Sequence, residues 1–270
     1  MILRPLLRKD SCCFDASVTE SFHDPYLVGS SVPLGHEQVQ TIIRSLAEPL
    51  QPFLSGSNNQ TTGPSSIQAP QDRTYPLGGR ALLTRINLQG VGPVVIKPYI
   101  RGGLVERIFR DRHFRLGPWG GIRAKSRARQ EYDFLRMAMG TGVQVPEPVG
   151  YAVRGLSVYR CWLITREIPN ARTLAELSLE DPGQAEALMD PVLAQVRLLV
   201  ERGMVHVDLH PGNVLVDQEG RAVIIDFDKA FVTTEPRNQL VFLYKKRWHR
   251  AVVRHRLPGM LYEKFLKGLP

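Results

Sequence analysis

The residues that most constrain this chain lie between positions 205 and 228, where polar residues stand at fixed offsets around two short apolar runs. His206 and Asp208 form a histidine-x-aspartate pair, Asn213 follows five residues after the aspartate, and Asp226 comes one apolar hairpin later. Phosphoryl-transfer sites use this spacing to set a base and two metal ligands around one reaction centre. The pattern therefore predicts a phosphoryl-transfer site and a fold that contains this hairpin.

The hairpin consists of two apolar segments, residues 214–216 and 222–225, separated by the polar turn 217–220. Asn213 stands just before the first strand and Asp226 just after the second. A hairpin brings those two ends together, so one cation could touch both side chains. We expect Asn213 and Asp226 to hold Mg²⁺, because amide and carboxylate oxygens suit this hard cation.

Asp208 is the candidate catalytic base. Its carboxylate can accept the proton of a substrate hydroxyl as the bond to phosphorus forms. The structural alternative is that Asp208 and Asn213 are turn formers, because both residue types bond their own backbone in turns. The joint pattern of four polar residues around two strands favours catalysis over that alternative.

Composition narrows the class of protein. The chain has 270 residues, of which 43% are hydrophobic, enough for one large domain or two small lobes. No run is long and apolar enough for a bilayer span, and residues 1–9 lack a signal-peptide layout. Cys12, Cys13 and Cys161 indicate neither a disulfide framework nor a zinc site, which favours a reducing, cytoplasmic setting.

The order of the predicted elements is that of an α+β, two-lobed, protein-kinase-like fold. We divide the chain into an N-terminal extension at 1–72, a sheet-rich N-lobe at 73–168, and a compact helical C-lobe with a basic tail at 169–270. Within the extension, the polar stretch at about 55–72 reads as a flexible loop. The predicted elements are a helix around 35–50, a hairpin of strands 81–86 and 94–97, a helix at 126–139, a strand at 159–168, one long helix at 184–202, and the catalytic hairpin.

Lys97 is the candidate phosphate-binding lysine. It ends an apolar strand, as the lysine of the kinase Val-Ala-Ile-Lys pattern does. Glu131, in the following helix, is the best candidate for its ion-pair partner, with Glu106 and Glu147 as competitors. Taken alone, Lys97 would be an ordinary solvated lysine; upstream of the catalytic pattern, the nucleotide role is favoured.

Two further segments belong to the predicted nucleotide site. The adjacent glycines Gly78 and Gly79 could form a turn that covers phosphates, although they could also only mark a hairpin. The full Gly-x-Gly-x-x-Gly pattern and the Walker A pattern are both absent from the sequence. Residues 165–168 would form the hinge whose backbone meets adenine.

Beyond this core, several segments carry a resemblance to a known family. They are residues 99–104, 110–112, 126–132, 145–148 and 168–171. With them, the chain from about 75 to 244 resembles the lipopolysaccharide core kinase family within the protein-kinase-like superfamily, and in particular its 3-deoxy-D-manno-octulosonic acid (Kdo) kinases. Two departures are that Asp228 replaces the glycine of the Asp-Phe-Gly triplet, and that residues before 73 have no counterpart in the family.

The resemblance implies an ATP- and Mg²⁺-dependent enzyme that phosphorylates a Kdo hydroxyl, by analogy the 4-hydroxyl, on a lipid A precursor. It also implies that the enzyme works as a peripheral protein at the cytoplasmic face of the bacterial inner membrane. By the same resemblance, Asp208 is the base, Asn213 and Asp226 are the metal ligands, and Lys97 is the phosphate lysine.

Two features favour a non-peptide acceptor independently of the resemblance. The part of the chain after Asp226 is short, whereas protein kinases need a long activation segment and further helices there. The net charge of +9 is concentrated at 101–129 and 245–256, which also carry Trp119 and Trp248. Such segments suit an anionic membrane surface and the phosphate and carboxylate groups of a glycolipid, with a merely solvated basic face as the structural alternative. No nucleic-acid motif accompanies the charge, so no nucleic acid is expected.

Four functions remain open from the sequence. A Kdo kinase is the leading one. A lipopolysaccharide heptose kinase would use another acceptor, and a small atypical protein kinase would phosphorylate a protein. A nucleotide-binding pseudokinase scaffold is disfavoured by the complete set of Lys97, Asp208, Asn213 and Asp226.

Overall fold

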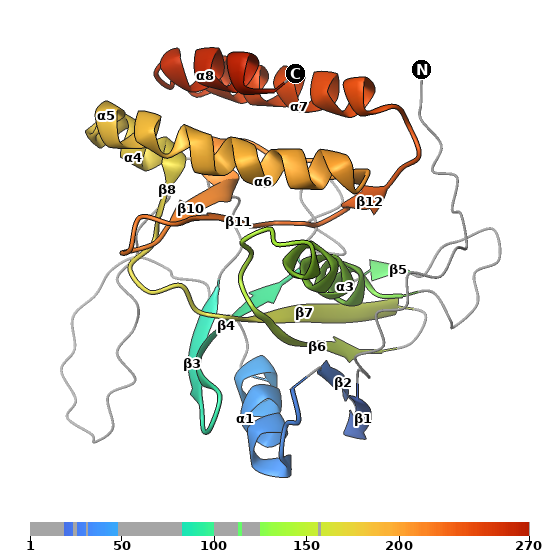
Figure 1. The fold of residues 1–270 in the computed structure, drawn as a ribbon. Coiled ribbons are helices and arrows are strands. Elements are labelled where there is room, and N and C mark those ends of the chain that lie inside the picture. The colour runs from blue at the N-terminus through green and yellow to red at the C-terminus, as the bar shows by residue number, and fades with distance from the viewer. Residues whose placement is uncertain are drawn as a thin grey trace, which may run out of the picture.

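A computed structural model shows a mixed α+β fold, with an antiparallel sheet formed mainly by N-terminal segments and helices in the C-terminal half (Figure 1). The structure describes residues 19–23, 26–30, 32–47, 83–99, 113–114, 125–155 and 158–269. Among the described residues, no helix combines the length and apolar character that a membrane crossing requires.

The large sheet has seven strands in the order β1-β2-β6-β7-β4-β3, with β5 paired to β7. Every pairing is antiparallel. The strands are β1 (Thr19–His23), β2 (Tyr26–Ser30), β3 (Thr84–Leu88), β4 (Gly92–Pro98), β5 (His113–Phe114), β6 (Pro148–Arg154) and β7 (Val158–Arg166). The predicted hairpin around 81–97 is present, but its strands run to 84–88 and 92–98, so its turn is earlier than expected.

The boundary predicted at residue 72 does not separate the described N-terminal residues from the sheet. β2 pairs with β6 along its whole length, from Tyr26 opposite Arg154 to Ser30 opposite Gly150. The backbone of β1 and β2 thus completes the same hydrogen-bonded sheet as residues 84–166. The loop predicted at about 55–72 lies outside the described residues.

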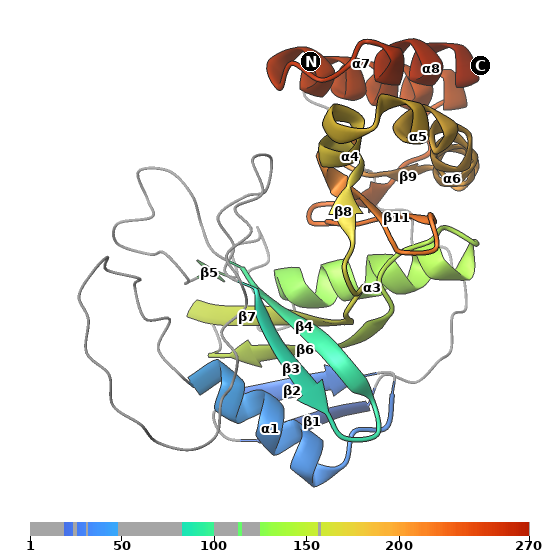
Figure 2. The ribbon, with the colours of Figure 1, turned by 90° about the vertical axis from the view of Figure 1, so that its left-hand side faces the viewer.

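The sheet is covered on both faces by helices (Figure 2). α1 (His36–Ala47) lies within the helix expected around 35–50 and buries Val39 and Ile42 against one face. α3 (Arg127–Gly140) packs on the other face through Tyr132 and Leu135. Because both faces of the central strands are buried, β6 has no alternation of polar and apolar residues, so its sequence does not carry the pattern that marks a strand.

α3 confirms the helix predicted at 126–139. Its first turn is capped by the Ser126 hydroxyl, which accepts a hydrogen bond from the Arg129 amide. Its buried face is made of residues at helical spacing: Ala128, Glu131, Tyr132, Leu135 and Ala138. The burial of Glu131 among apolar residues marks this position as one that needs a partner.

The C-terminal half is built from helices around short strands. The helices are α4 (Leu174–Glu180), α5 (Pro182–Ala187), α6 (Met189–Glu201), α7 (Arg237–Arg254) and α8 (Met260–Gly268), with a 3-10 turn η1 (Pro211–Asn213). The strands are β8 (Arg172–Thr173), β9 (Met204–Val205), β10 (Val214–Val216), β11 (Ala222–Ile224) and β12 (Phe231–Val232). The hairpin β10–β11 is the predicted catalytic hairpin.

The single helix predicted at 184–202 is wrong, because two helices, α5 and α6, meet at Leu188. Pro191 explains the break: it has no amide hydrogen to donate to the carbonyl four residues earlier. Proline is tolerated in the first turn of a helix, so α6 restarts just before it. The predicted stop at Gly203 is confirmed, since this residue has a φ of 63° after the end of α6.

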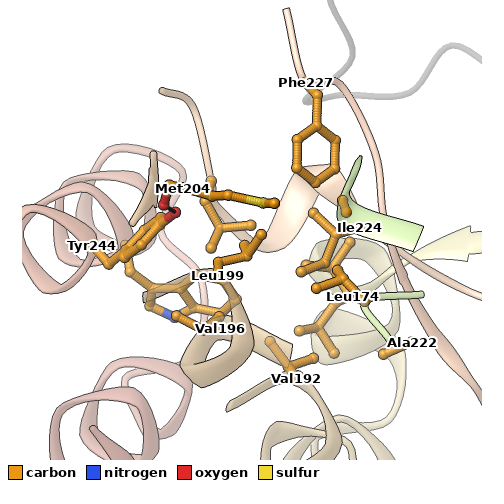
Figure 3. Packing of buried hydrophobic residues seen from close by; sticks show 14 of the residues in the cluster. Leu174, Val192, Val196, Leu199, Met204, Ala222, Ile224, Phe227 and Tyr244 are labelled. Carbon is orange, nitrogen blue, oxygen red and sulfur yellow. Dashed lines mark hydrogen bonds between the residues drawn. The ribbon is translucent and has the colours of Figure 1, made fainter. Parts of the chain in front are cut away.

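α6 lies at the centre of the C-terminal core, where Val192, Val196 and Leu199 are buried (Figure 3). Leu174 from α4, Ile224 from β11 and Tyr244 from α7 contribute to the same apolar cluster. Burying a side chain of this size stabilises a fold by about 1.5–3 kcal/mol. The loop after β9 and the hairpin β10–β11 therefore pack on a well-filled apolar core.

The position predicted for Trp248 at a membrane surface is wrong. Its side chain is fully buried, stacks on Phe265 at 4.3 Å between ring centroids, and donates from Nε1 to the Leu261 carbonyl over 3.1 Å. Trp248 is therefore one of the buried contacts that hold α8 against α7. Trp119 lies outside the described residues.

Candidate active site

The loop between β9 and η1 is held in place by His206. The His206 amide donates to the Tyr244 hydroxyl over 2.9 Å, and that hydroxyl donates to the Met204 carbonyl over 2.8 Å. The His206 ring spans the site: Nε2 lies 2.9 Å from the Ile225 carbonyl, and Nδ1 accepts from the Asp208 amide over 3.3 Å. These partners require a proton on Nε2 and none on Nδ1. Burial lowers the pKa of His206 to about 4, so the neutral ring connects the Asp208 loop to the strand before Asp226.

Asp208 presents an open carboxylate. Its side chain is 65% exposed, and its nearest described basic partner is His210 Nε2, at 3.8 Å from Oδ2. The backbone of Asp208 is fixed, since its amide is bound to His206 and its carbonyl accepts from Asn213 Nδ2 over 2.8 Å. A rigid backbone with an accessible carboxylate is the arrangement that a general base needs.

Asn213 ends η1 and is oriented by the same loop. Because its Nδ2 donates to the Asp208 carbonyl, its amide oxygen is left as an acceptor. Its own carbonyl accepts from the Ile225 amide over 3.0 Å. This bond places Asn213 beside the residue that precedes Asp226, so the prediction that the hairpin brings both to one end is confirmed as geometry.

Asp226 has an unusual backbone, with a φ of 66°. Left-handed φ values are uncommon for residues other than glycine and are often found at functional sites. Its Oδ1 accepts from Lys97 Nζ over 2.5 Å. Burial acts to raise the pKa of Asp226, but the charge and hydrogen bond of Lys97 outweigh it and hold the pKa below its usual value. Asp226 is therefore ionised across the neutral range.

Lys97, on β4, joins two carboxylates from different parts of the chain. Its Nζ lies 3.0 and 3.1 Å from the two carboxylate oxygens of Glu131, and it also binds Asp226. Burial would lower the pKa of Lys97, but the two carboxylates raise it above its ordinary value. Burial raises the pKa of Glu131, and Lys97 opposes that shift. The predicted Lys97–Glu131 ion pair is present, and the structure adds Asp226 to it.

Two site residues were not predicted. Tyr99 donates its hydroxyl to Glu131 Oε2, and the Arg127 guanidinium lies 5.2 Å from the centre of the Tyr99 ring. Arg127 forms an ion pair with Asp228, the residue that replaces the glycine of the kinase triplet. A sequence signal exists in both cases: Tyr99 lies two residues after Lys97 along the chain, and Arg127 stands one helical turn before Glu131.

The other predicted residues are accounted for as follows. Glu147 forms an ion pair with Arg166 at 2.6 Å and is therefore not the partner of Lys97. Glu106, Gly78 and Gly79 lie outside the described residues. In the hinge predicted at 165–168, the amides of Arg166 and Glu167 donate to the carbonyls of Glu147 and Pro93, over 2.8 and 3.0 Å.

Comparison with known proteins shows the family. The model of the lipopolysaccharide kinase (Kdo/WaaP) family matches residues 78–255, a range that contains every predicted site residue. The chain is 29% identical over 189 residues to a 3-deoxy-D-manno-octulosonic acid kinase of Vibrio parahaemolyticus, covering 68% of this chain and 71% of that protein.

Two further relatives carry the same name. A Vibrio cholerae protein is 33% identical over 139 residues, covering 51% of this chain and 56% of the relative. A Xanthomonas axonopodis pv. citri protein is 30% identical over 202 residues, covering 71% of this chain and 76% of the relative. The chain therefore belongs to the lipopolysaccharide kinase (Kdo/WaaP) family and is a phosphotransferase that acts on a sugar hydroxyl.

Proposed function

We propose that this protein uses ATP to phosphorylate a hydroxyl of Kdo, the 4-hydroxyl, in the inner core of lipopolysaccharide carried on a lipid A precursor. The observation that carries the proposal is the double ion pair of Lys97 with Glu131 and Asp226, beside a loop that exposes Asp208. The acceptor rests on the relatives, which carry the name of Kdo kinases. Membership of a kinase family implies ATP as the phosphoryl donor.

The nucleotide is proposed to bind between two lobes, a sheet-rich one that carries Lys97 and a helical one that carries Asp208. Glu131 would hold Lys97 in reach of the α- and β-phosphates, as in protein kinases. The hinge at 165–168 would meet adenine. There, the Ile168 amide has no hydrogen-bond partner among the residues that the structure describes, so it is free to donate to the base.

Asn213 and Asp226 fit a Mg²⁺ ion that arrives with the nucleotide. Asp226 offers a carboxylate that is 37% exposed, and Asn213 offers the amide oxygen that its bond to Asp208 leaves available. The described residues contain no cluster of three or more acidic, histidine or cysteine ligands, which suits a cation held partly by phosphates and water. When bound, the ion would neutralise the charge that develops on the phosphates.

Asp208 would act as the base. Its carboxylate accepts the proton of the acceptor hydroxyl while the hydroxyl oxygen bonds to the γ-phosphorus and the bond from that phosphorus to the β-phosphate oxygen breaks. The products are the phosphorylated sugar and ADP. The backbone bonds to His206 and Asn213 hold Asp208 still during this transfer.

The acceptor would be reached at an anionic membrane surface on the cytoplasmic side. The described face of α7 exposes Phe242 and Val253, at 63% and 64%, together with Lys246 and Arg250. Apolar side chains among cations suit the headgroup region of anionic lipids. We expect Phe242→Ser to weaken co-sedimentation with phosphatidylglycerol vesicles; unchanged binding would remove α7 from the contact.

The proposal is tested by incubating the purified protein with Mg²⁺, ATP and a defined Kdo–lipid A acceptor, with the product read by mass spectrometry. A gain of one phosphate on Kdo is expected, and nuclear magnetic resonance of the product locates it. Asp208→Asn should abolish transfer while ATP still binds. Full transfer by that variant would refute the mechanism, and transfer only to a heptose acceptor would refute the proposed sugar.

A further inference from the structure

Arg247, on α7, is half-buried and has no directly bonded counterion among the residues that the structure describes. Its Nη1 atom is shielded from solvent and has no hydrogen-bond partner among the described residues. The same part of the chain gives it no ion pair, although exposed arginines such as Arg221 and Arg172 have carboxylate partners. Keeping a cation partly buried without a counterion is unfavourable for folding. An anion that binds there would supply the missing counterion.

The location of Arg247 is set by Tyr244. One helical turn earlier on α7, Tyr244 bonds to the backbone of Met204 and His206, at the start of the catalytic loop. Residues three apart lie on the same side of a helix, so Arg247 faces that loop as well. α7 also packs directly on η1, which ends in Asn213.

The carboxylate of Asp208 acts electrostatically on Arg247. Burial lowers the pKa of Arg247, and the negative charge of Asp208 is the largest effect that opposes this. The two groups nevertheless form no ion pair within 4.0 Å in the described structure, and the Asp208 carboxylate stays exposed. The guanidinium thus lies on the side of α7 that faces the catalytic loop, and it does not occupy the Asp208 carboxylate.

We propose that Arg247 binds the carboxylate of the acceptor sugar while Asp208 faces the hydroxyl that is phosphorylated. This assignment rests on the proposed function and names the group by which the enzyme would select its substrate. An arginine fork matches a carboxylate with two parallel hydrogen bonds. The acceptor carboxylate would supply the counterion that Arg247 lacks.

The chemistry of the acceptors makes this contact selective. Kdo is an acid, with its carboxylate bonded directly to the anomeric ring carbon, C2, and the 4-hydroxyl two ring carbons further on. A heptose has hydroxyls but no carboxylate. Binding a heptose would leave the Arg247 charge buried and unpaired, which disfavours that acceptor. Arg247 would therefore distinguish the two acceptor classes that the family suggests.

The test uses the full chain with Mg²⁺, ATP and two soluble acceptors: the methyl glycoside of Kdo and its C1 carboxamide. The wild type should prefer the free acid by about 10- to 100-fold in kcat/KM, the effect of one charge-assisted hydrogen bond. Arg247→Gln should reduce that preference to near unity, with little change on the amide, and Arg247→Lys should retain part of it. Arg237→Gln, an exposed arginine at the start of α7, is the matched control and should keep the full preference.

Stability separates this role from a structural one. A residue that only holds the fold would lower the midpoint of thermal unfolding when replaced, whereas loss of an unpaired buried charge should leave it unchanged or raise it. A retained preference in Arg247→Gln, or an equal loss on acid and amide, would overturn the assignment; the equal loss would point to the γ-phosphate instead. If the wild type phosphorylates only a heptose glycoside, the proposed acceptor itself fails, and this assignment with it.

Discussion

Arg127, at the start of α3, and Asp228, two residues after Asp226, form a forked ion pair that joins the two halves of the protein. Arg127 Nε lies 3.2 Å from Asp228 Oδ1, and Nη2 binds the other carboxylate oxygen. One turn further along α3, Glu131 binds Lys97, which in turn binds Asp226. These three ion pairs fix α3 against both ends of the short segment 226–228, directly at Asp228 and through Lys97 at Asp226.

The Arg127 pair should support catalysis without touching the reactants. We expect Arg127→Ala to lower the free energy of unfolding by about 1–3 kcal/mol, because it leaves a partly buried carboxylate without its partner. It should also lower kcat, since α3 loses one of the two contacts that set Glu131. Urea unfolding and steady-state kinetics measure the two effects.

A matched comparison is Arg172→Ala, which removes an exposed ion pair with Glu180 that involves neither α3 nor residues 226–228. That change should cost less than about 1 kcal/mol and leave kcat alone. The exchange Arg127→Asp with Asp228→Arg should recover part of the lost activity. Equal effects of Arg127→Ala and Arg172→Ala would show that the Arg127 pair is an ordinary surface contact.

Lys97→Met should cost both activity and stability, and the loss of stability should depend on pH. Activity should fall by about 10²–10³-fold, the usual effect of losing one charge-stabilising group. At pH 7.5, removing Lys97 leaves the buried Glu131 carboxylate facing the partly exposed Asp226 carboxylate. We therefore expect a loss of about 3 kcal/mol in unfolding free energy, the low end of the range for breaking a buried ion pair.

The difference in unfolding free energy between the wild type and Lys97→Met should become smaller as pH falls. In the wild type, Lys97 depresses the pKa of Asp226, so that stability is present above the unfolded pKa and is lost toward acid. In the variant, burial and mutual repulsion raise the pKa values of Glu131 and Asp226, so protonation favours the folded state at low pH. Urea unfolding at pH 7.5 and 5 tests this, with Lys125→Met as an exposed control. A gap that is constant with pH would contradict it.

Local patterns in the sequence predicted the parts of the site that local structure determines. The hairpin spacing placed Asn213 beside Asp226, and the helical spacing placed Glu131 on the buried face of α3. Distant pairings were not predictable in this way. The Arg127–Asp228 pair joins residues 101 positions apart in the sequence. The pairing of β2 with β6 likewise joins residues 26–30 to residues 150–154. Nothing in the neighbouring residues of either partner specifies such contacts.

The remaining errors have separate physical causes. The basic neighbours of Trp248 favour a membrane surface, but the residue is buried by α8, and tertiary packing alone determines the position of that helix. The break at Leu188 follows from Pro191, a local signal that helical periodicity concealed. The strand β6 was missed because full burial removes the alternation that marks a strand.

His206 should make the protein less stable in mild acid. Its pKa is about 4 in the fold, below the ordinary value for histidine, because burial excludes the charged ring. As pH falls below about 6.5, the unfolded chain takes up a proton that the folded chain cannot, so stability declines by up to about 3 kcal/mol toward pH 4. Urea unfolding between pH 7.5 and 4.5 should show this decline in the wild type. His206→Gln should be less stable at neutral pH but show a smaller decline, and an equal decline in both would exclude His206 as its source.

The backbone conformation of Asp226 should destabilise the fold, while its carboxylate is needed for function. Its φ of 66° is a conformation that glycine adopts freely and other residues adopt at a cost of about 1 kcal/mol or more. Asp226→Gly and Asp226→Ala both remove the carboxylate, so both should lose phosphoryl transfer and Mg²⁺-dependent ATP binding. They differ in backbone freedom alone: the glycine variant should be more stable than the alanine variant by about 1 kcal/mol in urea unfolding. Equal stability of the two variants would show that the backbone at Asp226 relaxes once the bond to Lys97 is gone.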